Sequence, residues 1–271
     1  MKRFGLLILT SILMISAFSI KPFSNNFTAK DGNAMFQLPD EKQADNVLTP
    51  KEQKEGWLLL WNGKNLDGWV GYRDGAPVAK GWTIRDNELI ADLPENKGGG
   101  DIVTSKEFKN FILEVDFLYT PGANSGIKYF IQPDESGKGF SNVGCEYQVL
   151  DDDLHPDAKL GIDGDRTLAS LYDLIKGNAQ KFDASKPVKP TNGVNKWNRA
   201  RIEVRGEKVA HYLNGSKVVE YIRGTPEWRA LVATSKFKDH KGFGEFATGH
   251  LLLQDHGNEV HYKNIKIKEL K

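Results

Sequence analysis

The chain has 271 residues, of which 39% are hydrophobic and 10% aromatic, enough to build a substantial core. A chain of this length suits a single β-sandwich domain. Its 37 basic and 36 acidic residues leave a formal net charge of +1, so there is no electrostatic basis for binding nucleic acid or an anionic membrane surface. The single cysteine, Cys145, excludes an intrachain disulfide and a cysteine-based metal cage.

The first 20 residues have the pattern of a signal peptide. Lys2 and Arg3 precede an apolar run over residues 4–20, and Ala17 and Ser19 have the small side chains and the spacing that a signal peptidase needs. We therefore expect an exported protein, in the periplasm or beyond it, with no stable membrane span once this segment is cleaved. An uncleaved anchor is the alternative, although the run is somewhat short for a spanning helix.

Residues 21–47 are polar and show no periodicity, which indicates a linker. The folded domain is expected over residues 48–271. It begins with a short helix, because Thr49 is a capping residue, Pro50 stands at the first helical position and Glu52 follows the cap by three residues.

Beyond this helix the apolar residues recur with a period of two, which is typical of strands with one buried face. Asn214-Gly215 between two such runs indicates a tight hairpin. One late helix is expected over 226–237, capped by Thr225. Many short strands with glycine-rich turns predict an all-β fold, a sandwich of two antiparallel sheets with minor short helices. The alternating runs cover 113–119, 127–131, 145–149, 200–204, 209–213 and 217–221, and two further strand-like runs cover 251–254 and 262–269.

The segment most suggestive of chemistry is the run that leads to His155. Glu146 and Gln148 are two residues apart on a predicted strand, so both project from one sheet face, whereas Cys145 points the other way, into the core. Three aspartates, Asp151 the first of them, follow the strand. A carboxylate and an amide beside an acidic loop with a histidine suit proton transfer and hydroxyl recognition. A solvated strand face followed by an ordinary acidic turn explains the same spacing.

Two other segments carry polar side chains that are candidates for a site. Gln254 and His256 stand at the end of an apolar run, where they would line the mouth of a site. Asp101 follows three consecutive glycines, in a loop that would let a sugar approach the backbone. A solvated strand end and a plain connection are the alternatives.

Asn124 begins a further strand, in which Ile127, Tyr129 and Ile131 are expected on one face and Lys128 and Phe130 on the other. Lys128 would stabilise an oxyanion, or would simply be solvated. The chain contains none of the signatures of zinc proteases, phosphate-binding loops or serine hydrolases.

A series of short strings also occurs in order along the chain. They are Gly-Trp-Leu-Leu-Leu-Trp-Asn-Gly-Lys-Asn-Leu-Asp-Gly-Trp at 56–69, Gly-Asp-Ile-Val-Thr at 100–104, Asn-Ser-Gly-Ile at 124–127, Glu-Tyr-Gln-Val-Leu-Asp-Asp at 146–152, Leu-Tyr-Asp-Leu-Ile at 171–175, Gln-Asp-His-Gly at 254–257 and Lys-Asn-Ile-Lys-Ile at 263–267. In these strings the chain, from Leu48 to its C-terminus, resembles the 3-keto-disaccharide hydrolase family, distant fold relatives of family 16 glucanases and legume lectins. The resemblance implies a concanavalin A-like jelly roll with a sugar-binding concave face.

Family members are similar to enzymes that cleave glycosides already oxidised at C3 by a separate dehydrogenase. The resemblance thus implies a hydrolase or lyase for 3-keto-disaccharides. A ketone at C3 acidifies the C2 hydrogen, so a base can form an enolate, the enolate expels the C1 substituent, and water then adds. This route needs a base, a group that stabilises the enolate oxygen and an acid. It does not need the paired carboxylates of ordinary glycosidases.

Within this hypothesis each candidate has an expected role. Glu146 is the base, His155 or His256 is the acid and Lys128 is the oxyanion partner. A divalent metal held by Glu146, both histidines and an aspartate is a further option, because oxygen and imidazole ligands suit several ions. No other cofactor is expected. The predicted substrate-binding residues are Gln148, Asp101, Asn124, Tyr172, Gln254 and Asp151.

The rival hypothesis is a non-catalytic, lectin-like carbohydrate-binding module. In that case Trp69, Tyr72 or Trp82 would stack on sugar faces. For the enzyme, the oxidised glycoside substrate implies functional coupling to a glycoside 3-dehydrogenase. This chain does not supply that activity itself, because it has no glycine-rich dinucleotide motif after a strand.

Overall fold

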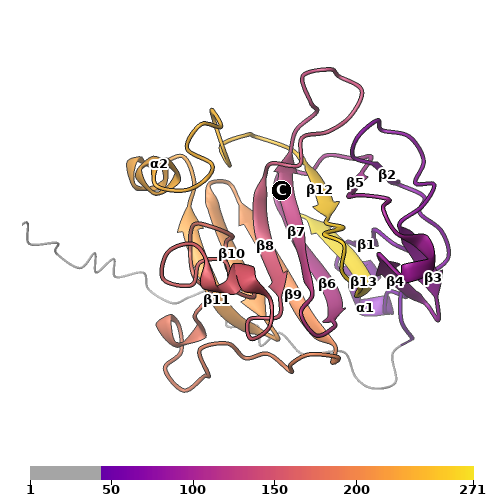
Figure 1. Ribbon diagram of the computed structural model, residues 1–271, viewed down its shortest axis with the longest axis horizontal. Coiled ribbons are helices and arrows are strands. Elements are labelled where there is room, and N and C mark those ends of the chain that lie inside the picture. Colours follow the sequence, from indigo (N-terminus) through magenta and orange to yellow (C-terminus); the bar gives the residue numbers. More distant parts are fainter. Residues whose placement is uncertain (1–43) are drawn as a thin grey trace, which may run out of the picture. The chain divides into compact units, whose positions relative to one another are not determined.

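The structure, a computed structural model, describes residues 44–271, which form two antiparallel β-sheets packed face to face (Figure 1). One sheet has eight strands and the other has five. In the described chain, helices occur only as short segments, one before the first strand and the others in the connections between strands. This arrangement confirms the predicted all-β sandwich of jelly-roll type with minor short helices.

The signal peptide and most of the linker expected before residue 48 lie outside the described residues. Asp45 and Asn46 already contact the sandwich: Lys263 Nζ lies 3.0 Å from Asp45 Oδ2, and the Asn46 amide donates to Asn264 Oδ1 at 2.6 Å. The folded contacts therefore begin before Leu48. No helix within residues 44–271 is long and apolar enough to cross a membrane.

The eight-stranded sheet brings together strands from both ends of the domain. Its hairpin between β10 and β11 confirms the turn predicted at Asn214-Gly215: φ is 46° at Asn214 and 82° at Gly215, the positive values that a type I′ turn requires at both central positions. In spatial order the strands are β11 (Ser216–Ile222), β10 (Lys208–Leu213), β9 (Asn198–Arg205), β6 (Phe111–Tyr119), β13 (Val260–Glu269), β4 (Glu88–Ala91) and β3 (Trp82–Arg85), and β1 (Trp57–Leu59) also pairs with β13.

The five-stranded sheet ends at strand β8, whose free edge is covered by another part of the chain. The Ala169 amide donates to the Gln148 carbonyl at 2.8 Å, and the Tyr172 amide donates to the Glu146 carbonyl at 3.0 Å. This cover satisfies edge groups that would otherwise be open to another strand. The spatial order is β2 (Trp69–Gly71), β5 (Ile102–Thr104), β12 (His250–Leu253), β7 (Asn124–Ile131) and β8 (Cys145–Leu150).

The core lies between the two sheets and includes one side of β8. Cys145, Tyr147 and Val149 have no exposed surface, as the period of two predicted. Burial raises the pKa of the Cys145 thiol to about 12, so the thiol is an inert part of the core.

A backbone irregularity in β7 makes one predicted alternation wrong. Phe130 has a φ of 61°, and the pairing with β12 shifts its register beside it. The bulge turns Phe130 into the main core, where it is 1% exposed, although we had expected it to face outward. Ile131 instead joins Val103 and Leu252 in a small apolar cluster on the outer face of the sheet.

The first helix, α1 (Pro50–Lys54), forms where the capping residues predicted it. The Thr49 hydroxyl accepts from the Glu52 amide at 3.2 Å, and the Glu52 carboxylate accepts from the Thr49 amide at 2.7 Å. These two bonds are the reciprocal pair of a capping box. The remaining short helices are η1 (Pro94–Asn96), η2 (Pro156–Lys159) and η3 (Ala179–Lys181).

The late helix, α2 (Pro226–Ala233), begins at the predicted cap but ends earlier than residue 237. The hydroxyls of Thr234 and Ser235 accompany its end, because they donate to the carbonyls of Leu231 and Val232, each at 2.8 Å. Hydroxyl side chains that bond the last carbonyls compete with continued helix. The chain after residue 235 therefore forms a turn.

A row of stacked aromatic rings fixes this turn to the sandwich. Tyr221 on β11 stacks on Trp228 of α2 with ring centroids 5.0 Å apart, and Trp228 stacks on Phe243 at 6.1 Å. Phe243 in turn stacks on Phe237 at 4.2 Å. The position of Phe237 and its neighbours is therefore determined by packing against the core.

A buried ionic cluster fills the outer face of β6 and β9. Arg199 binds both carboxylate oxygens of Asp116, at 2.6 Å for Nη2 to Oδ2, and its Nη1 lies 3.8 Å from Glu114 Oε2. Asn264 donates to the same Asp116 oxygen at 2.8 Å. Buried charges of this kind are tolerated because each has an opposite partner.

Removal of one member of the cluster should be costly. We expect Arg199→Met to lower the free energy of unfolding by about 3–5 kcal/mol, because it leaves the buried Asp116 carboxylate without its cation. Arg205→Met on the same strand is the control, since the Arg205 side chain is 56% exposed, and it should cost less than about 1 kcal/mol. Urea unfolding of both variants measures the difference, and equal losses would contradict the assignment.

Candidate functional site

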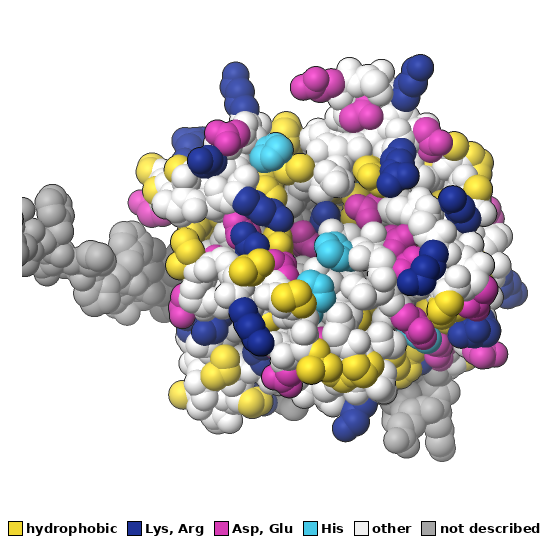
Figure 2. Space-filling view, viewed as in Figure 1, with side chains coloured by type: hydrophobic (Ala, Val, Ile, Leu, Met, Phe, Trp, Pro, Cys, Tyr) yellow, Lys and Arg dark blue, Asp and Glu magenta, His cyan; other side chains and the backbone are white. Residues whose placement is uncertain are grey.

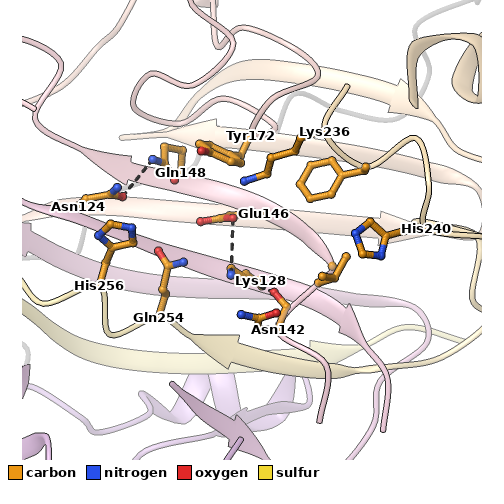
Figure 3. A pocket seen from close by; sticks show the side chains of 13 residues that line it. Asn124, Lys128, Asn142, Glu146, Gln148, Tyr172, Lys236, His240, Gln254 and His256 are labelled. Atoms are coloured by element: carbon orange, nitrogen blue, oxygen red, sulfur yellow. Dashed lines mark hydrogen bonds and ion pairs between the residues drawn. The ribbon is translucent and has the colours of Figure 1, made fainter. Parts of the chain in front are cut away.

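A pocket of about 260 Å³ opens on the outer face of the five-stranded sheet, over strands β7, β8 and β12. Figure 2 shows this face, on which histidine, basic and acidic side chains gather around a central hollow. The pocket is lined by Asn124, Lys128, Asn142, Val143, Gly144, Glu146, Gln148, Tyr172, Lys236, Phe237, His240, Gln254 and His256 (Figure 3).

Strand register brings the polar side chains of this pocket together. Glu146 stands opposite Lys128, and Gln148 stands opposite Gly126. Directly paired residues share a sheet face, so these side chains all project outward. The main-chain amide of Gln254 donates to the Gly126 carbonyl at 3.0 Å, which adds the end of β12 to the same face. The structure thus places Glu146, Gln148 and Gln254 together, as the period of two predicted.

The electrostatics of the pocket are centred on Glu146. Loss of water raises the pKa of this carboxyl group above its ordinary value, and the negative charges of Asp101 and Asp157 add to the effect. The cations of Lys128 and Lys236 oppose it. Lys128 Nζ lies 3.9 Å from Glu146 Oε2, and each of the two side chains is only 7% exposed. Glu146 is therefore a desolvated carboxylate held next to a buried ammonium.

A glycine on the neighbouring strand makes room for this carboxylate. A methyl group at Gly126 would lie 2.0 Å from Glu146 Oε1. Such an overlap cannot be accommodated, so any side chain at this position would displace the carboxylate. Gly126 lacks the positive φ that would make a backbone argument for glycine, so its small size is what the site uses.

The amide of Gln148 lies between two polar neighbours. In one orientation its Nε2 donates to Asn124 Oδ1 at 3.1 Å. In the opposite orientation its Nε2 donates to Glu146 Oε1, also at 3.1 Å. Rotation of this one amide therefore changes whether Glu146 receives a hydrogen bond, and Asn124 and Gln148 together present amide groups to a polar ligand.

Gln254 and His256 form the other polar wall. Gln254 Oε1 is buried and has no hydrogen-bond partner within the described chain, which leaves an acceptor for a ligand hydroxyl. His256 is exposed at the mouth of the pocket. Figure 3 shows both side chains on the same side of Glu146 as Asn124.

Asp101, which we had expected to bind substrate, lies behind the pocket wall. Its Oδ1 accepts from the Asp255 amide at 2.9 Å, while Asp255 Oδ2 accepts from the Gly100 amide at 2.9 Å. This reciprocal clamp ties the end of β12 to the start of β5. Desolvation raises the pKa of Asp101, and its charge still acts on the pocket through Lys128 and His256. Asp101 supports the residues that line the site.

Asp151 also has a supporting place rather than a position on the pocket wall. The residue is buried, and its two oxygens accept from the amides of Gly122 at 2.8 Å and Asp153 at 3.1 Å. A carboxylate with these local backbone partners organises the turn after β8. Its side chain faces the loop because the strand has ended before it.

His155 lies next to the pocket but does not line it. Its Nδ1 accepts from the Asp157 amide at 3.2 Å, which caps η2, and its ring centroid is 6.0 Å from that of His256. Desolvation, and the neighbouring His256, lower the pKa of His155. Of the two histidines proposed as acid, His256 alone contributes to the pocket surface.

Tyr172 lines the pocket beside Gln148, and its hydroxyl is held by a carboxylate (Figure 3). Its hydroxyl donates to Asp157 Oδ2 at 2.7 Å, and Arg166 Nη1 donates to Asp157 Oδ1 at 3.0 Å. Desolvation and the adjacent carboxylate raise the pKa of Tyr172, so its phenol stays protonated. The side chain presents its ring, and not a free hydroxyl, to the pocket.

Sequence reasoning missed the wall that follows α2. Lys236, Phe237 and His240 line the pocket there, and Asn142 lines it from the loop before β8. The helix had been expected to continue to residue 237, which hid the turn. The Thr234-Ser235 pair, with hydroxyls able to bond helix carbonyls, is the signal that pointed to an earlier end.

The predicted metal ligands do not assemble into a site. Among residues 44–271, no group of three or more His, Cys, Asp or Glu side chains is placed to hold a metal ion. The charged group nearest to Glu146 is Lys128, and the His155 ring is engaged as a helix cap. These residues therefore do not fit a metal ion.

The aromatic side chains expected of a lectin-like module also lie elsewhere. Trp69 and Trp82 are buried, and their indole groups donate to the carbonyls of Leu60 at 2.7 Å and Gly100 at 2.9 Å. Tyr72 packs against the small apolar cluster that contains Ile131. Neither tryptophan can present its face to a sugar in this arrangement.

Comparison with known proteins places the chain in a defined group. A family model described as a 3-keto-alpha-glucoside-1,2-lyase-like domain matches residues 56–268. A 3-keto-disaccharide hydrolase of Bacteroides thetaiotaomicron (strain VPI-5482) is 37% identical over 251 residues, which cover 84% of this chain and 83% of the relative. A candidate glycosyl hydrolase structure from Parabacteroides distasonis ATCC 8503 is 32% identical with a TM-score of 0.71, over 84% of this chain and 100% of that chain. A second structure from that organism, 23% identical with a TM-score of 0.52 over 79% of this chain and 99% of that one, is similar in fold.

A methyl group at Gly126 should displace the Glu146 carboxylate without unfolding the protein. Because non-bonded atoms need about 3.5 Å, we expect Gly126→Ala to move the carboxylate by at least about 1 Å in a crystal structure. Gly71→Ala is the control in the same sheet, since its new methyl group would meet the nearest atom at 3.4 Å. An unmoved Glu146 in the Gly126→Ala variant would show that the glycine is not needed for room.

Proposed function

The chain belongs to the family of 3-keto-α-glucoside-1,2-lyase-like domains, and from this premise we propose that it cleaves 3-keto-disaccharides by proton abstraction at C2, elimination at C1 and addition of water. One observation supports this route above others. Among the described residues that line the pocket, Glu146 is the single carboxylate, and two lysines accompany it. Ordinary glycosidases need two carboxyl groups across the scissile bond, whereas elimination from a ketone needs one base and a cation.

Glu146 has the properties of the base. Its raised pKa makes the carboxylate a stronger proton acceptor than an exposed glutamate, while Lys128 keeps it ionised. The ketone at C3 makes the hydrogen on C2 more acidic, so a carboxylate is sufficient to abstract it. The buried position excludes water that would otherwise weaken the base.

The amide wall would orient the sugar ring. Asn124, Gln148 and Gln254 offer hydrogen-bonding groups to ring hydroxyls. The oxygen of Gln254 has no partner within the described chain, so it needs a hydroxyl of the sugar to donate to it. His256, exposed at the mouth, is the group placed to give a proton to the departing oxygen. His155 behind it acts as a positioning residue.

The substrate requires an earlier reaction elsewhere. A 3-keto-disaccharide arises by oxidation of the C3 hydroxyl, so we propose functional coupling to a glycoside 3-dehydrogenase. The basic and apolar start of the chain supports export, with both activities reached from the periplasm. Detection of the N-terminally trimmed chain in the periplasmic fraction would support this location, and its restriction to the cytosol would contradict it.

The substrate test compares two sugars that differ only at C3. We expect purified protein to release glucose and 3-keto-glucose from 3-keto-trehalose and to leave trehalose intact, because trehalose has no acidic C2 hydrogen. Product analysis by mass spectrometry measures both. Absence of turnover of the keto sugar, with and without added divalent ions, would remove the proposal.

Variants of two glutamates sharpen this test. Glu146→Gln preserves shape but removes the base, so kcat/KM should fall by about 10²–10⁴-fold, while 3-keto-trehalose still binds. Glu259→Gln is the control, because Glu259 lies outside the pocket wall. Turnover by Glu146→Gln at the wild-type rate would exclude Glu146 as the base. Binding by the wild type without turnover would favour the lectin-like module.

The pH dependence follows from the charges around Glu146. Activity should rise with pH through the raised pKa of Glu146, because the base must be ionised. Lys128 favours the ionised form, so Lys128→Met should raise that pKa further and move the acid limb of kcat/KM to higher pH. Lys138→Met, at an exposed position outside the pocket wall, is the control. An acid limb that stays in place, or moves to lower pH, in Lys128→Met would contradict this role for the ion pair.

A further inference from the structure

The pocket contains two lysines, and they differ in what they contact. Lys128 is buried, donates from Nζ to the Asn142 carbonyl at 3.0 Å and lies 3.9 Å from Glu146. Its charge is thus matched to the base and its ammonium is held in place. Lys128 is suited to keeping Glu146 ionised, and less suited to meeting a new negative charge on a substrate.

Lys236 is the cation without such a partner. Its side chain is exposed along much of its length, but its Nζ lies 4.0 Å from the centroid of the Tyr172 ring and 5.1 Å from that of Phe237 (Figure 3). Within residues 44–271, no carboxylate lies within 4.0 Å of this Nζ and no hydrogen-bond acceptor is bound to it. All three of its N–H groups are available to a ligand.

The main chain at Lys236 is nevertheless fixed. Its amide donates to Asp173 Oδ2 at 2.7 Å, and Arg166 Nε donates to Asp173 Oδ1 at 2.5 Å. The next residue, Phe237, ends the aromatic stack that leads back to the core. A fixed main chain that carries a free ammonium above an aromatic ring makes a preorganised binding group for an anion.

We propose that Lys236 is the catalytic residue that binds the enolate oxygen formed at C3, an inference that rests on the proposed function. Glu146 accepts the C2 proton, the C2–H electron pair becomes the C2=C3 bond, and the former C3=O π pair moves to the oxygen facing Lys236. The pair then returns to re-form the ketone. The C2=C3 pair becomes the C1=C2 bond, and the leaving oxygen departs with a proton from His256. Glu146 then returns its proton to C2 while the hydroxyl of a water adds at C1, and the remaining proton of that water restores His256, which completes hydrolysis.

The surroundings of Lys236 favour this role over simple solvation. Partial desolvation lowers its pKa, and the cations of Lys128 and Arg166 act in the same direction, against Glu146 and Asp173. An ammonium of lowered pKa shares its proton more readily with an enolate oxygen than an ordinary lysine does. Lys236 must be protonated to meet the enolate oxygen.

The first experiment removes the charge. We expect Lys236→Met to lower kcat on 3-keto-trehalose by about 10²–10³-fold, the usual loss for an oxyanion donor. Affinity should change by less than about threefold, measured by calorimetry in the non-reacting Glu146→Gln background, because the neutral ketone gains little from the ammonium. Because the Lys236 side chain is exposed, we expect the variant to stay folded, and its melting temperature checks this directly.

The second experiment restores the charge chemically. Lys236→Cys treated with 2-bromoethylamine forms a thioether that carries an ammonium group, as the thiolate displaces bromide. Cys145 stays unmodified because it is buried and its pKa is raised to about 12. We expect treatment to recover at least about a tenth of wild-type kcat, since the restored ammonium again meets the enolate. A merely structural role would not depend on the ammonium.

Lys238 gives a matched control two residues away. It is exposed and does not line the pocket, so Lys238→Met and alkylated Lys238→Cys should both keep wild-type kcat. Lys236→Met with more than about a third of wild-type kcat, or Lys236→Cys without recovery on alkylation, would overturn the assignment. These results are distinct from failure of the proposed function, in which the wild type itself would not turn over 3-keto-trehalose.

Discussion

The cross-strand contact between Glu146 and Lys128 is the constraint on which the site depends. A carboxylate removed from water would protonate or move unless a cation accompanies it, and the pairing of β7 with β8 supplies that cation from the opposite residue. The same pairing fixes both side chains on the outer face of the sheet. Because the strand backbone is rigid, the Glu146 carboxylate keeps its position and its raised pKa without help from a ligand.

Residues on the neighbouring strands leave room for this pair and hold the residues around it. Gly126 leaves the volume that the carboxylate occupies, and the clamp between Asp101 and Asp255 holds the end of β12 that carries Gln254. The wall that bears Lys236 has a different origin, since it is a turn anchored by stacked rings. The pocket thus combines a floor of amides and a carboxylate, held by strands, with an ammonium carried by an anchored turn.

This charge pattern supports the proposed elimination over the direct displacement of ordinary glycosidases. A single carboxylate between two cations cannot supply both the acid and the base of a direct displacement at C1. It suits a reaction in which the substrate already carries its own electron sink, the ketone. Under the proposed route the activating step is performed before binding, and this protein would contribute a base, a charge for the enolate and polar contacts for the ring.

The sequence by itself determined the sandwich, the Asn214-Gly215 hairpin, the Thr49 cap and the shared face of Glu146 and Gln148. Each depends on a local pattern, a period of two or a capping preference, that any short stretch of chain reveals. Gln254 was found by the same argument. The family strings added the expected substrate class, which spacing alone did not contain.

Only the tertiary structure decided that Lys236 faces Glu146, that Asp101 and Asp151 support the site from behind, and that Phe130 turns into the core. These placements arise from contacts between segments far apart in the chain: the Asp173 bond to the Lys236 amide, the Asp255 clamp and the register shift against β12. A periodic pattern assigns a side chain to a face of its own strand. It carries no information about which distant turn will be packed above that face, because that is set by the three-dimensional path of the chain.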